Sequence, residues 1–406
     1  MSSKNPEVLE NLILNEFQDD GSCSASYPGD KLKIFGGIPG EIVNVEVIRK
    51  FDDELICMVS DVIKPSKDRV QAECKFYLNC SGCQFQHLSY QAQLDFKKNL
   101  VFKALDGLNS FSEENLNNPI PSPKIYNYRN HGRFTVAKSK EFRGNLGFVN
   151  RWTRKLVQIT DCKIMDGKIN EILAEVKGKV EGYSQFSIRA GINSKEYLIQ
   201  PSINNLNKFE SGQKSYLEII NGNRHKISSP SFFQVNTAQA TKLGKIIKAN
   251  LNLKGEEVVM DAFSGVGTFA ILLSKYVKKI YAVETSYSSV EDARFNIKSL
   301  KNIELIFGEV EKIDKDMFEP IDVIILDPSR KGVHPDALSW VGSMSVKKLV
   351  YVSCNVQTLR RDLNYLTNKY EIRKVIPIDM FPHTKHIETI VVMKLKDNKK
   401  ILKKYI

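Results

Sequence analysis

Five short apolar segments in the second half of this 406-residue chain are each followed by polar or reactive residues. The segments are residues 258–260, 280–283, 303–307, 323–326 and 349–352. Four of the residues at their ends are Asp261, Glu284, Asp327 and Cys354. Open α/β sheets bind ligands at the carboxyl ends of their parallel strands. The pattern therefore predicts a doubly wound sheet with these side chains gathered at a ligand-binding edge.

A glycine-rich turn, Asp261-Ala-Phe-Ser-Gly-Val-Gly-Thr268, joins the first of these segments to an expected helix at about 269–276. Glycines let the backbone approach a ligand closely, and a helix start offers free N–H groups. Glu284 at the next strand end suits a ribose diol. A dinucleotide oxidoreductase is the rival interpretation, because its fingerprint tolerates alanine at the position of Ala270. The Asp-x-Phe-x-Gly-x-Gly spacing and the Asp327-Pro strand end favour S-adenosylmethionine, the pattern of class I methyltransferases.

A cysteine and a glutamate near the end of the chain are the candidate reactive groups. Cys354 stands just beyond the apolar segment 349–352, and Glu388 closes the block Asp379-Met-Phe-Pro-His-Thr-Lys-His-Ile-Glu388. A carboxylate in a loop beside a later strand can return to the same sheet edge, which would pair a nucleophile with a proton acceptor. Taken alone, Cys354 is as readily a small buried apolar residue and Glu388 a surface carboxylate. The surrounding motifs favour the reactive interpretation.

Three of the seven cysteines, Cys74, Cys80 and Cys83, fall within ten residues. Short loops can bring three thiolates to one soft metal centre, and Cys162 is the candidate fourth ligand. Four-cysteine zinc is the structural rival, and reduced cysteines without a metal are the remaining alternative. An odd cysteine count without a secretory signal argues against a disulfide framework.

The first half of the chain predicts two further regions. Residues 8–64 read as short strands broken by glycine and proline, for which a small five-stranded barrel is the economical fold. A helix at 85–105 and renewed strand signals from 128 to about 198 follow. The run Ser229-Pro-Ser-Phe-Phe-Gln-Val-Asn236 precedes a helix from about Thr237, with Asn236 as its N-cap. Gln234 in this run can hydrogen-bond a ligand, although an ordinary strand-to-helix turn is the alternative.

Composition restricts the partners. The formal net charge is +12, which indicates a polyanion, nucleic acid before membrane surface. No apolar run approaches the roughly 18 residues of a membrane span. The first residues lack the apolar core of a secretory signal. We therefore expect a cytoplasmic monomer that binds RNA and no membrane.

Together these motifs closely resemble the RNA (uracil-5-)-methyltransferases that use S-adenosylmethionine, in order along nearly the whole chain. The resemblance implies a multidomain α/β protein with three parts. These are an OB-like RNA-binding barrel of the TRAM type at 1–64, a mainly-β domain with an iron–sulfur site at 65–226, and a Rossmann-like class I methyltransferase domain with a doubly wound sheet at 227–406. Two positions depart from the family: Val356 stands where proline is common, and Thr268 where some members have asparagine.

The resemblance also implies roles for single residues. A [4Fe–4S] cluster would be held by Cys74, Cys80, Cys83 and Cys162. The S-adenosylmethionine and target-base site would be lined by Gln234, Phe263, Thr268, Glu284 and Asp327. Cys354 would add to C6 of a uracil, and Glu388 would be the base. The expected substrate is a uridine in 23S ribosomal RNA, with transfer RNA second. A non-catalytic RNA-binding protein and an iron–sulfur redox enzyme with a dinucleotide site are the competing hypotheses.

Overall fold

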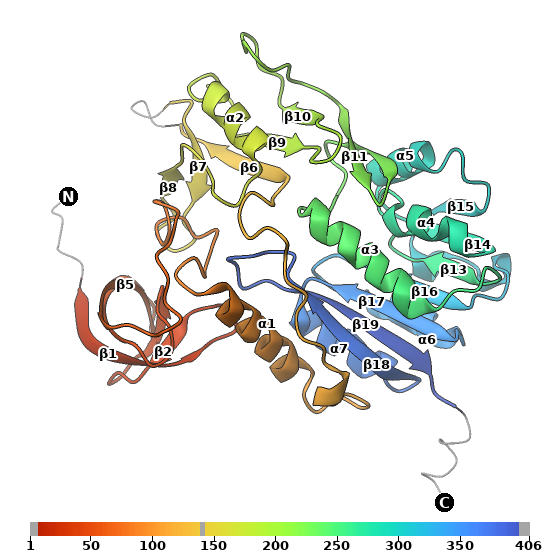
Figure 1. The fold of residues 1–406 in the computed structure, drawn as a ribbon, viewed down its shortest axis with the longest axis horizontal. Helices are drawn as coiled ribbons and strands as arrows, with labels where there is room; N and C mark the ends of the chain where they lie inside the picture. The colour runs from red at the N-terminus through yellow and green to blue at the C-terminus, as the bar shows by residue number, and fades with distance from the viewer. Residues whose placement is uncertain (1–6, 139–142, 398–406) are drawn as a thin grey trace, which may run out of the picture.

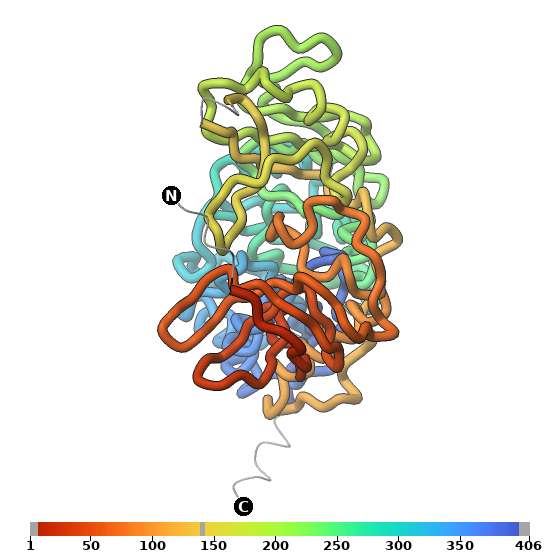
Figure 2. Tube along the Cα trace, turned by 90° about the vertical axis from the view of Figure 1, so that its left-hand side faces the viewer, coloured from red at the N-terminus to blue at the C-terminus, as the bar shows by residue number. Residues whose placement is uncertain are grey.

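The computed structural model describes residues 7–138 and 143–397. In Figure 1 the chain forms three bodies: a small barrel at the lower left, a sheet with one helix at the top, and a larger sheet flanked by helices on the right. Figure 2 shows the barrel and the upper sheet at opposite ends of one face. Within the described part of the chain, no helix has the length and apolarity that crossing a membrane requires.

The first body is a closed barrel, as the sequence predicts. Alternating side chains of its strands are fully buried, among them Val43 and Val45, because successive residues of a strand point to opposite faces. The barrel order is β1-β2-β3-β5-β4. Its strands are β1 (Val8–Phe17), β2 (Cys23–Ala25), β3 (Lys31–Phe35), β4 (Ile42–Lys50) and β5 (Glu54–Lys64).

The second body is a five-stranded antiparallel sheet that packs against one helix, α2 (Gly167–Val176). The strand order is β10-β9-β6-β7-β8, and a two-stranded ribbon follows it. The strands of the sheet are β6 (His131–Val136), β7 (Leu146–Val149), β8 (Leu156–Gln158), β9 (Gln185–Ala190) and β10 (Tyr197–Gln200). The ribbon strands are β11 (Ser215–Ile220) and β12 (Asn223–Ser228).

The third body is built on a seven-stranded sheet of order β15-β14-β13-β16-β17-β19-β18. Six strands run in the same direction, and β19 lies antiparallel between β17 and β18. The strands are β13 (Val258–Asp261), β14 (Lys279–Glu284), β15 (Ile303–Phe307), β16 (Val323–Leu326), β17 (Lys348–Ser353), β18 (Tyr370–Ile378) and β19 (Glu388–Leu395). The predicted doubly wound sheet is therefore present.

Helices cover both faces of this sheet. Alternate residues of each strand enter different cores: Val259 faces one and Met260 the other. The first core contains side chains from α3 (Thr237–Leu251) and α4 (Thr268–Leu273), and the second from α6 (Pro335–Ser343) and α7 (Val356–Leu366). A further helix, α5 (Tyr287–Asn296), packs beside β12 and β14. Burial on both faces explains why the strands read as continuous apolar runs.

Helix α1 (Tyr90–Leu105) belongs structurally to the large sheet. Its residues Val101 and Leu105 are fully buried in the same core as α6 and α7. The segment after it also bridges to the edge strand β18, through Leu116 with Val375. The sequence-based partition places this helix in the region 65–226, so the structure differs there. The difference arises because α1 is amphipathic toward a sheet that lies more than 150 residues later in the chain, which local patterns do not reveal.

Candidate active site

The register of the sheet brings the predicted thiol and carboxylate together. Ser353 at the end of β17 pairs with Thr389 in the antiparallel strand β19. Cys354 directly follows the last residue of β17, and Glu388 is the first residue of β19, so the pairing of these two strands brings both residues to the same end of the sheet. Cys354 itself lies in the turn between β17 and α7.

Cys354 sits between a strand end and a helix start. The side chain of Asn355 caps α7 by accepting a hydrogen bond from the backbone N–H of Gln357, at 3.2 Å. Ser353 Oγ accepts a bond from the Asn355 N–H at 3.2 Å and donates one to the Asn355 carbonyl at 3.0 Å. Val356, which departs from the family pattern, is the first residue of α7 and is buried. Proline suits this position because the N–H there is unpaired, yet the turn is held here without it.

Two acidic side chains dominate the electrostatics around Cys354. Glu388 is 2% exposed, and burial together with the nearby Asp327 raises its pKa well above the usual value. Burial likewise raises the pKa of Asp327. Close carboxylates of this kind resist carrying two charges, so the pair holds a proton near neutral pH. Burial, Glu388 and Asp327 raise the pKa of the Cys354 thiol to about 12, while Arg330 opposes them. These effects together favour the protonated form of the Cys354 thiol.

The glycine turn after β13 is fixed by Glu284. One carboxylate oxygen accepts a hydrogen bond from the Gly265 N–H at 2.8 Å, and the other accepts bonds from the N–H groups of Thr285 and Ser286 at 2.8 and 2.7 Å. Gly267 has a φ of 88°, which non-glycine residues rarely adopt, and it caps α4. The short α4 that follows begins at Thr268. The turn and the strand end are thus locked to each other before a ligand binds.

Asp261, which the sequence analysis places at the ligand-binding edge without assigning it a role, is a further acidic group there. It is fully buried, and burial, Asp327 and Glu284 raise its pKa to about 8. One oxygen accepts a bond from the Ala270 N–H at 3.2 Å, and the other has no hydrogen-bond partner among the described residues. Its place as the last residue of β13, at the start of the glycine turn, is the sequence signal that would have identified it.

The remaining predicted ligand-binding residues lie around the same edge. Phe263 is half-buried and packs against the core that contains α6 and α7. The carbonyl of Gln234 accepts a hydrogen bond from Asn130 at 3.0 Å, which leaves its half-buried side chain free of that contact. Two residues later, Asn236 caps α3 as predicted and donates from Nδ2 to the Met380 carbonyl at 3.3 Å. This bond ties the Gln234 segment to the loop between β18 and β19.

A cavity of about 430 Å³ connects the reactive edge with the cysteine-rich loops. Its lining includes Cys354, Arg330, Thr384 and His386, together with Cys74, Cys80, Cys83 and Cys162. Arg129, Arg133 and Lys163 also line it, so the mouth carries positive charge beside the thiols. The space is in the range of a small-ligand pocket and has room for a nucleobase.

The four predicted cluster cysteines converge, although not as ligands of a single ion. Each lines the same cavity, and the other three thiols raise the pKa of Cys83, after burial as the main cause. In the described ranges 7–138 and 143–397, no group of three or more His, Cys, Asp or Glu is placed so that it could hold one metal ion. In a four-iron cluster each thiolate binds a different iron, so the sulfurs stand farther apart than around one ion. Four thiols are the donor type that either a four-iron cluster or a zinc ion would use.

Comparison with known proteins now defines the class and the family. The solved structure of the Pyrococcus abyssi tRNA (uracil-54, C5)-methyltransferase, in complex with S-adenosyl-L-homocysteine, superposes with a TM-score of 0.75, at 24% identity over 94% of this chain and 99% of that one. The fold is that of a class I methyltransferase. The family model described as tRNA (Uracil-5-)-methyltransferase matches residues 217–396. An RNA methyltransferase of Clostridium acetobutylicum is 32% identical over 95% of this chain and 97% of its own length, and one of Clostridium tetani is 31% identical over 90% and 92%. The chain belongs to the RNA (uracil-5-)-methyltransferase family.

Proposed function

We propose that this protein methylates C5 of a uridine in RNA through a covalent adduct between Cys354 and C6 of the uracil. The observation that supports the proposal is the pairing of β17 with β19, which brings Glu388 within electrostatic reach of Cys354, a residue that lines a cavity large enough for a base. A thiol both attacks and leaves well, which a reversible adduct requires. Family membership supports the same reaction.

The chemistry explains why both residues are needed. C5 of uracil is a poor nucleophile. The Cys354 thiol first releases its proton to solvent, and addition of the resulting thiolate to C6 places enolate character on C4 and C5. S-adenosylmethionine would supply an electrophilic methyl group to C5, with S-adenosylhomocysteine as the leaving group. C5 now carries both the methyl group and its original proton. Glu388 removes that proton, the C5–C6 double bond re-forms, and the Cys354 thiolate is expelled.

The cofactor would lie against the glycine turn and the acidic strand ends. Phe263 and Thr268 belong to the turn and Glu284 binds it, and Asp327 is close enough to both Asp261 and Cys354 to raise the pKa of each. The unpaired oxygen of Asp261 is a buried acceptor that a bound ligand or water can satisfy. Gln234, next to the Asn236–Met380 bond, would hold the target base or the cofactor.

A [4Fe–4S] cluster on Cys74, Cys80, Cys83 and Cys162 belongs to the same proposal. The four thiols surround one end of the cavity, and none of the methylation steps needs a metal. We therefore assign the cluster a structural or RNA-positioning role. It would order a segment that is poor in regular structure, since residues 65–89 contain no helix or strand of the described set.

The substrate proposal is ribosomal RNA, with transfer RNA as the alternative that the family model and the P. abyssi structure favour by name. The target base must leave its stack to reach Cys354, which costs about a few kcal/mol. Additional RNA-binding domains would offset this cost through contacts with the rest of the RNA. We propose the barrel (1–64) and the central region (65–226) for that role, and residues 227–406 for catalysis, in a cytoplasmic monomer.

The test is methyl transfer from labelled S-adenosylmethionine to separated ribosomal and transfer RNA from a strain that lacks the protein, with enzyme purified without air. We expect 5-methyluridine in one of the two pools. Label in transfer RNA keeps the chemistry and changes the substrate. The absence of label in both pools, with cofactor bound, contradicts the proposal and favours a non-catalytic RNA-binding protein.

A further inference from the structure

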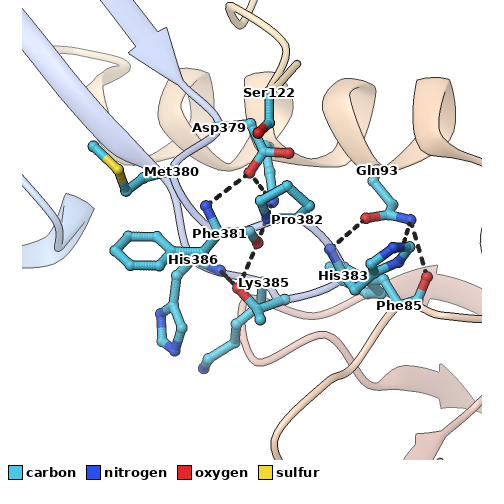
Figure 3. Close-up of polar contacts among 12 residues, drawn as sticks. Phe85, Gln93, Ser122, Asp379, Met380, Phe381, Pro382, His383, Lys385 and His386 are labelled. Atoms are coloured by element: carbon cyan, nitrogen blue, oxygen red, sulfur yellow. Dashed lines mark hydrogen bonds and ion pairs between the residues drawn. The ribbon is translucent and has the colours of Figure 1, made fainter. Parts of the chain in front are cut away.

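The loop between β18 and β19, residues 379–387, forms one wall of the cavity beside Cys354. Thr384 and His386 of this loop line the cavity together with Cys354 and Arg330. Figure 3 shows the His386 imidazole directed away from the contacts that hold the loop. The mechanism above uses Glu388, at the end of this loop, and leaves His386 without a role.

The loop is held rigidly from the side of α1. Lys97 Nζ lies 2.6 Å from Asp379 Oδ1 and donates to the Phe381 carbonyl at 3.0 Å, and both ion-pair side chains are fully buried. Gln93 Oε1 accepts the His383 N–H at 2.8 Å, and the His383 carbonyl accepts bonds from the N–H groups of residues 84 and 85 at 2.9 and 3.0 Å (Figure 3). These bonds fix the backbone on which His386 is carried.

The tautomer of His386 is set by Arg330. Arg330 Nη2 lies 3.1 Å from His386 Nδ1. A guanidinium group only donates hydrogen bonds, so Nδ1 must be the acceptor and the ring proton must lie on Nε2. Burial and the nearby cations Arg330, Lys385, Lys97 and Arg151 lower the pKa of His386 to about 3, which agrees with a neutral ring. The Nε2–H group has no partner among the hydrogen bonds of the described residues.

We propose that His386 donates a hydrogen bond from Nε2 to O4 of the target uracil, with Arg330 as the positioning residue that fixes the donor tautomer. The inference rests on the proposed function. When Cys354 adds to C6, negative charge accumulates on O4, and a fixed donor at that atom stabilises the transition state. Cytosine carries an amino group on C4 in place of O4. This amino group donates hydrogen bonds, so it cannot accept one from His386 Nε2. The same contact therefore selects uracil over cytosine.

The experiment is a comparison of enzyme variants with a substrate change at one atom. Single-turnover methyl transfer is measured on a transcript of the RNA that the wild-type protein labels, made with uridine or with 4-thiouridine, whose sulfur is a weak acceptor. We expect His386→Leu to slow the uridine transcript by about 100-fold, the usual cost of one such donor. The thio substitution should slow the wild-type protein but add little to the Leu variant. His386→Gln, which keeps an N–H group, should methylate the uridine transcript at a rate between those of the wild-type protein and the Leu variant.

Equal slowing of the wild-type protein and the Leu variant by 4-thiouridine overturns the inference, because a merely structural residue gives independent effects. A Gln variant as slow as the Leu variant, with normal S-adenosylmethionine binding by calorimetry, also overturns it. If the Leu variant does not bind the cofactor, the Gln variant is used instead. A smaller rate difference between the uridine and 4-thiouridine transcripts in the Gln variant than in the wild-type protein then supports the contact, and an equal difference overturns it. If the wild-type protein does not methylate the uridine transcript, the proposed function itself is contradicted. This outcome differs from every outcome that contradicts only the role of His386.

Discussion

The two ends of the shared cavity are built in different ways. At the reactive end, Cys354 directly follows β17 and Glu388 is the first residue of β19, and these two strands pair with each other. At the cysteine end, the thiols stand on loops, which are held by bonds such as that from the Cys74 N–H to Gln86 at 3.1 Å and that from the Cys162 N–H to Asn170 at 2.9 Å. The difference teaches that strand pairing positions the reactive end, whereas loop contacts position the four thiols.

The largest expected effect is at the nucleophile. Cys354→Ala should abolish methyl transfer while leaving cofactor binding and the melting temperature near those of the wild-type protein, because the half-buried side chain lines a cavity and is not part of a hydrophobic core. Labelled methyl transfer and calorimetry measure the two properties. Cys354→Ser is the matched control and should also be inactive, since a hydroxyl group is a weak nucleophile at this site. Turnover by the alanine variant contradicts the assignment.

The base should give a different signature at the same end. Glu388→Gln should lower turnover by about 10²–10⁴-fold, the usual contribution of a proton acceptor, while a covalent protein–RNA adduct accumulates because C5 keeps its proton. Denaturing gels detect the adduct, and Cys354→Ala combined with Glu388→Gln is the control that must not form it. A fully active Gln variant excludes Glu388 as the base.

Breaking the buried ion pair between Lys97 of α1 and Asp379 tests how far the loop between β18 and β19 depends on α1. Lys97→Met removes the cation and leaves Asp379 buried without it, which should cost about 3–5 kcal/mol of unfolding free energy. Denaturant titration measures the loss. Lys98→Met on the same helix, where the ammonium is exposed, is the matched control and should change little. Equal stability of both variants would show that the loop is held by other contacts.

The cysteine end should respond differently to the loss of one ligand. Cys80→Ala should reduce the iron content of anaerobically purified protein and expose the loops around residues 74–83 to protease, with cofactor binding unchanged. Iron assay and limited proteolysis provide the two readouts. Cys57→Ala, in the barrel core, is the control for iron content. Full iron occupancy in the Cys80 variant contradicts the proposed ligand set.

The smallest expected effect concerns pH. The pKa of Asp261 is raised from 3.8 to about 8, so the folded state binds a proton that the unfolded state releases. The stability that this proton contributes is present in full below about pH 4 and is lost as the pH rises toward 8. Asp261→Asn should remove a slope of up to about 1.4 kcal/mol per pH unit in this window. Denaturant titrations at pH 5 and 7.5 measure it, and an unchanged slope contradicts the assignment.

Much of this arrangement could be predicted from local patterns. The barrel, the sheet of the second half and the Asn236 cap follow from apolar alternation, turn residues and strand ends. The sequence pattern places Asp261 at the ligand-binding edge but gives it no role, because a strand-terminal aspartate is also typical of an ordinary turn. The buried ion pair between Lys97 of α1 and Asp379 could not be predicted, because the two residues are 282 positions apart in the sequence. A lysine in an expected helix also normally indicates a solvated face. The contact between Arg330 and His386 could not be predicted either, because these residues are also far apart in the sequence.

The pairing of β19 between β17 and β18 also orders events in time. During synthesis the segment with the thiol leaves the ribosome before the segment with its partner carboxylate, and the two meet only when the last strand inserts between two strands made earlier. Chains fold largely from the N-terminus as they emerge. A nascent chain that stops short of residue 388 therefore carries the thiol without the carboxylate, and the proposed reactive pair assembles only after β19 has been translated.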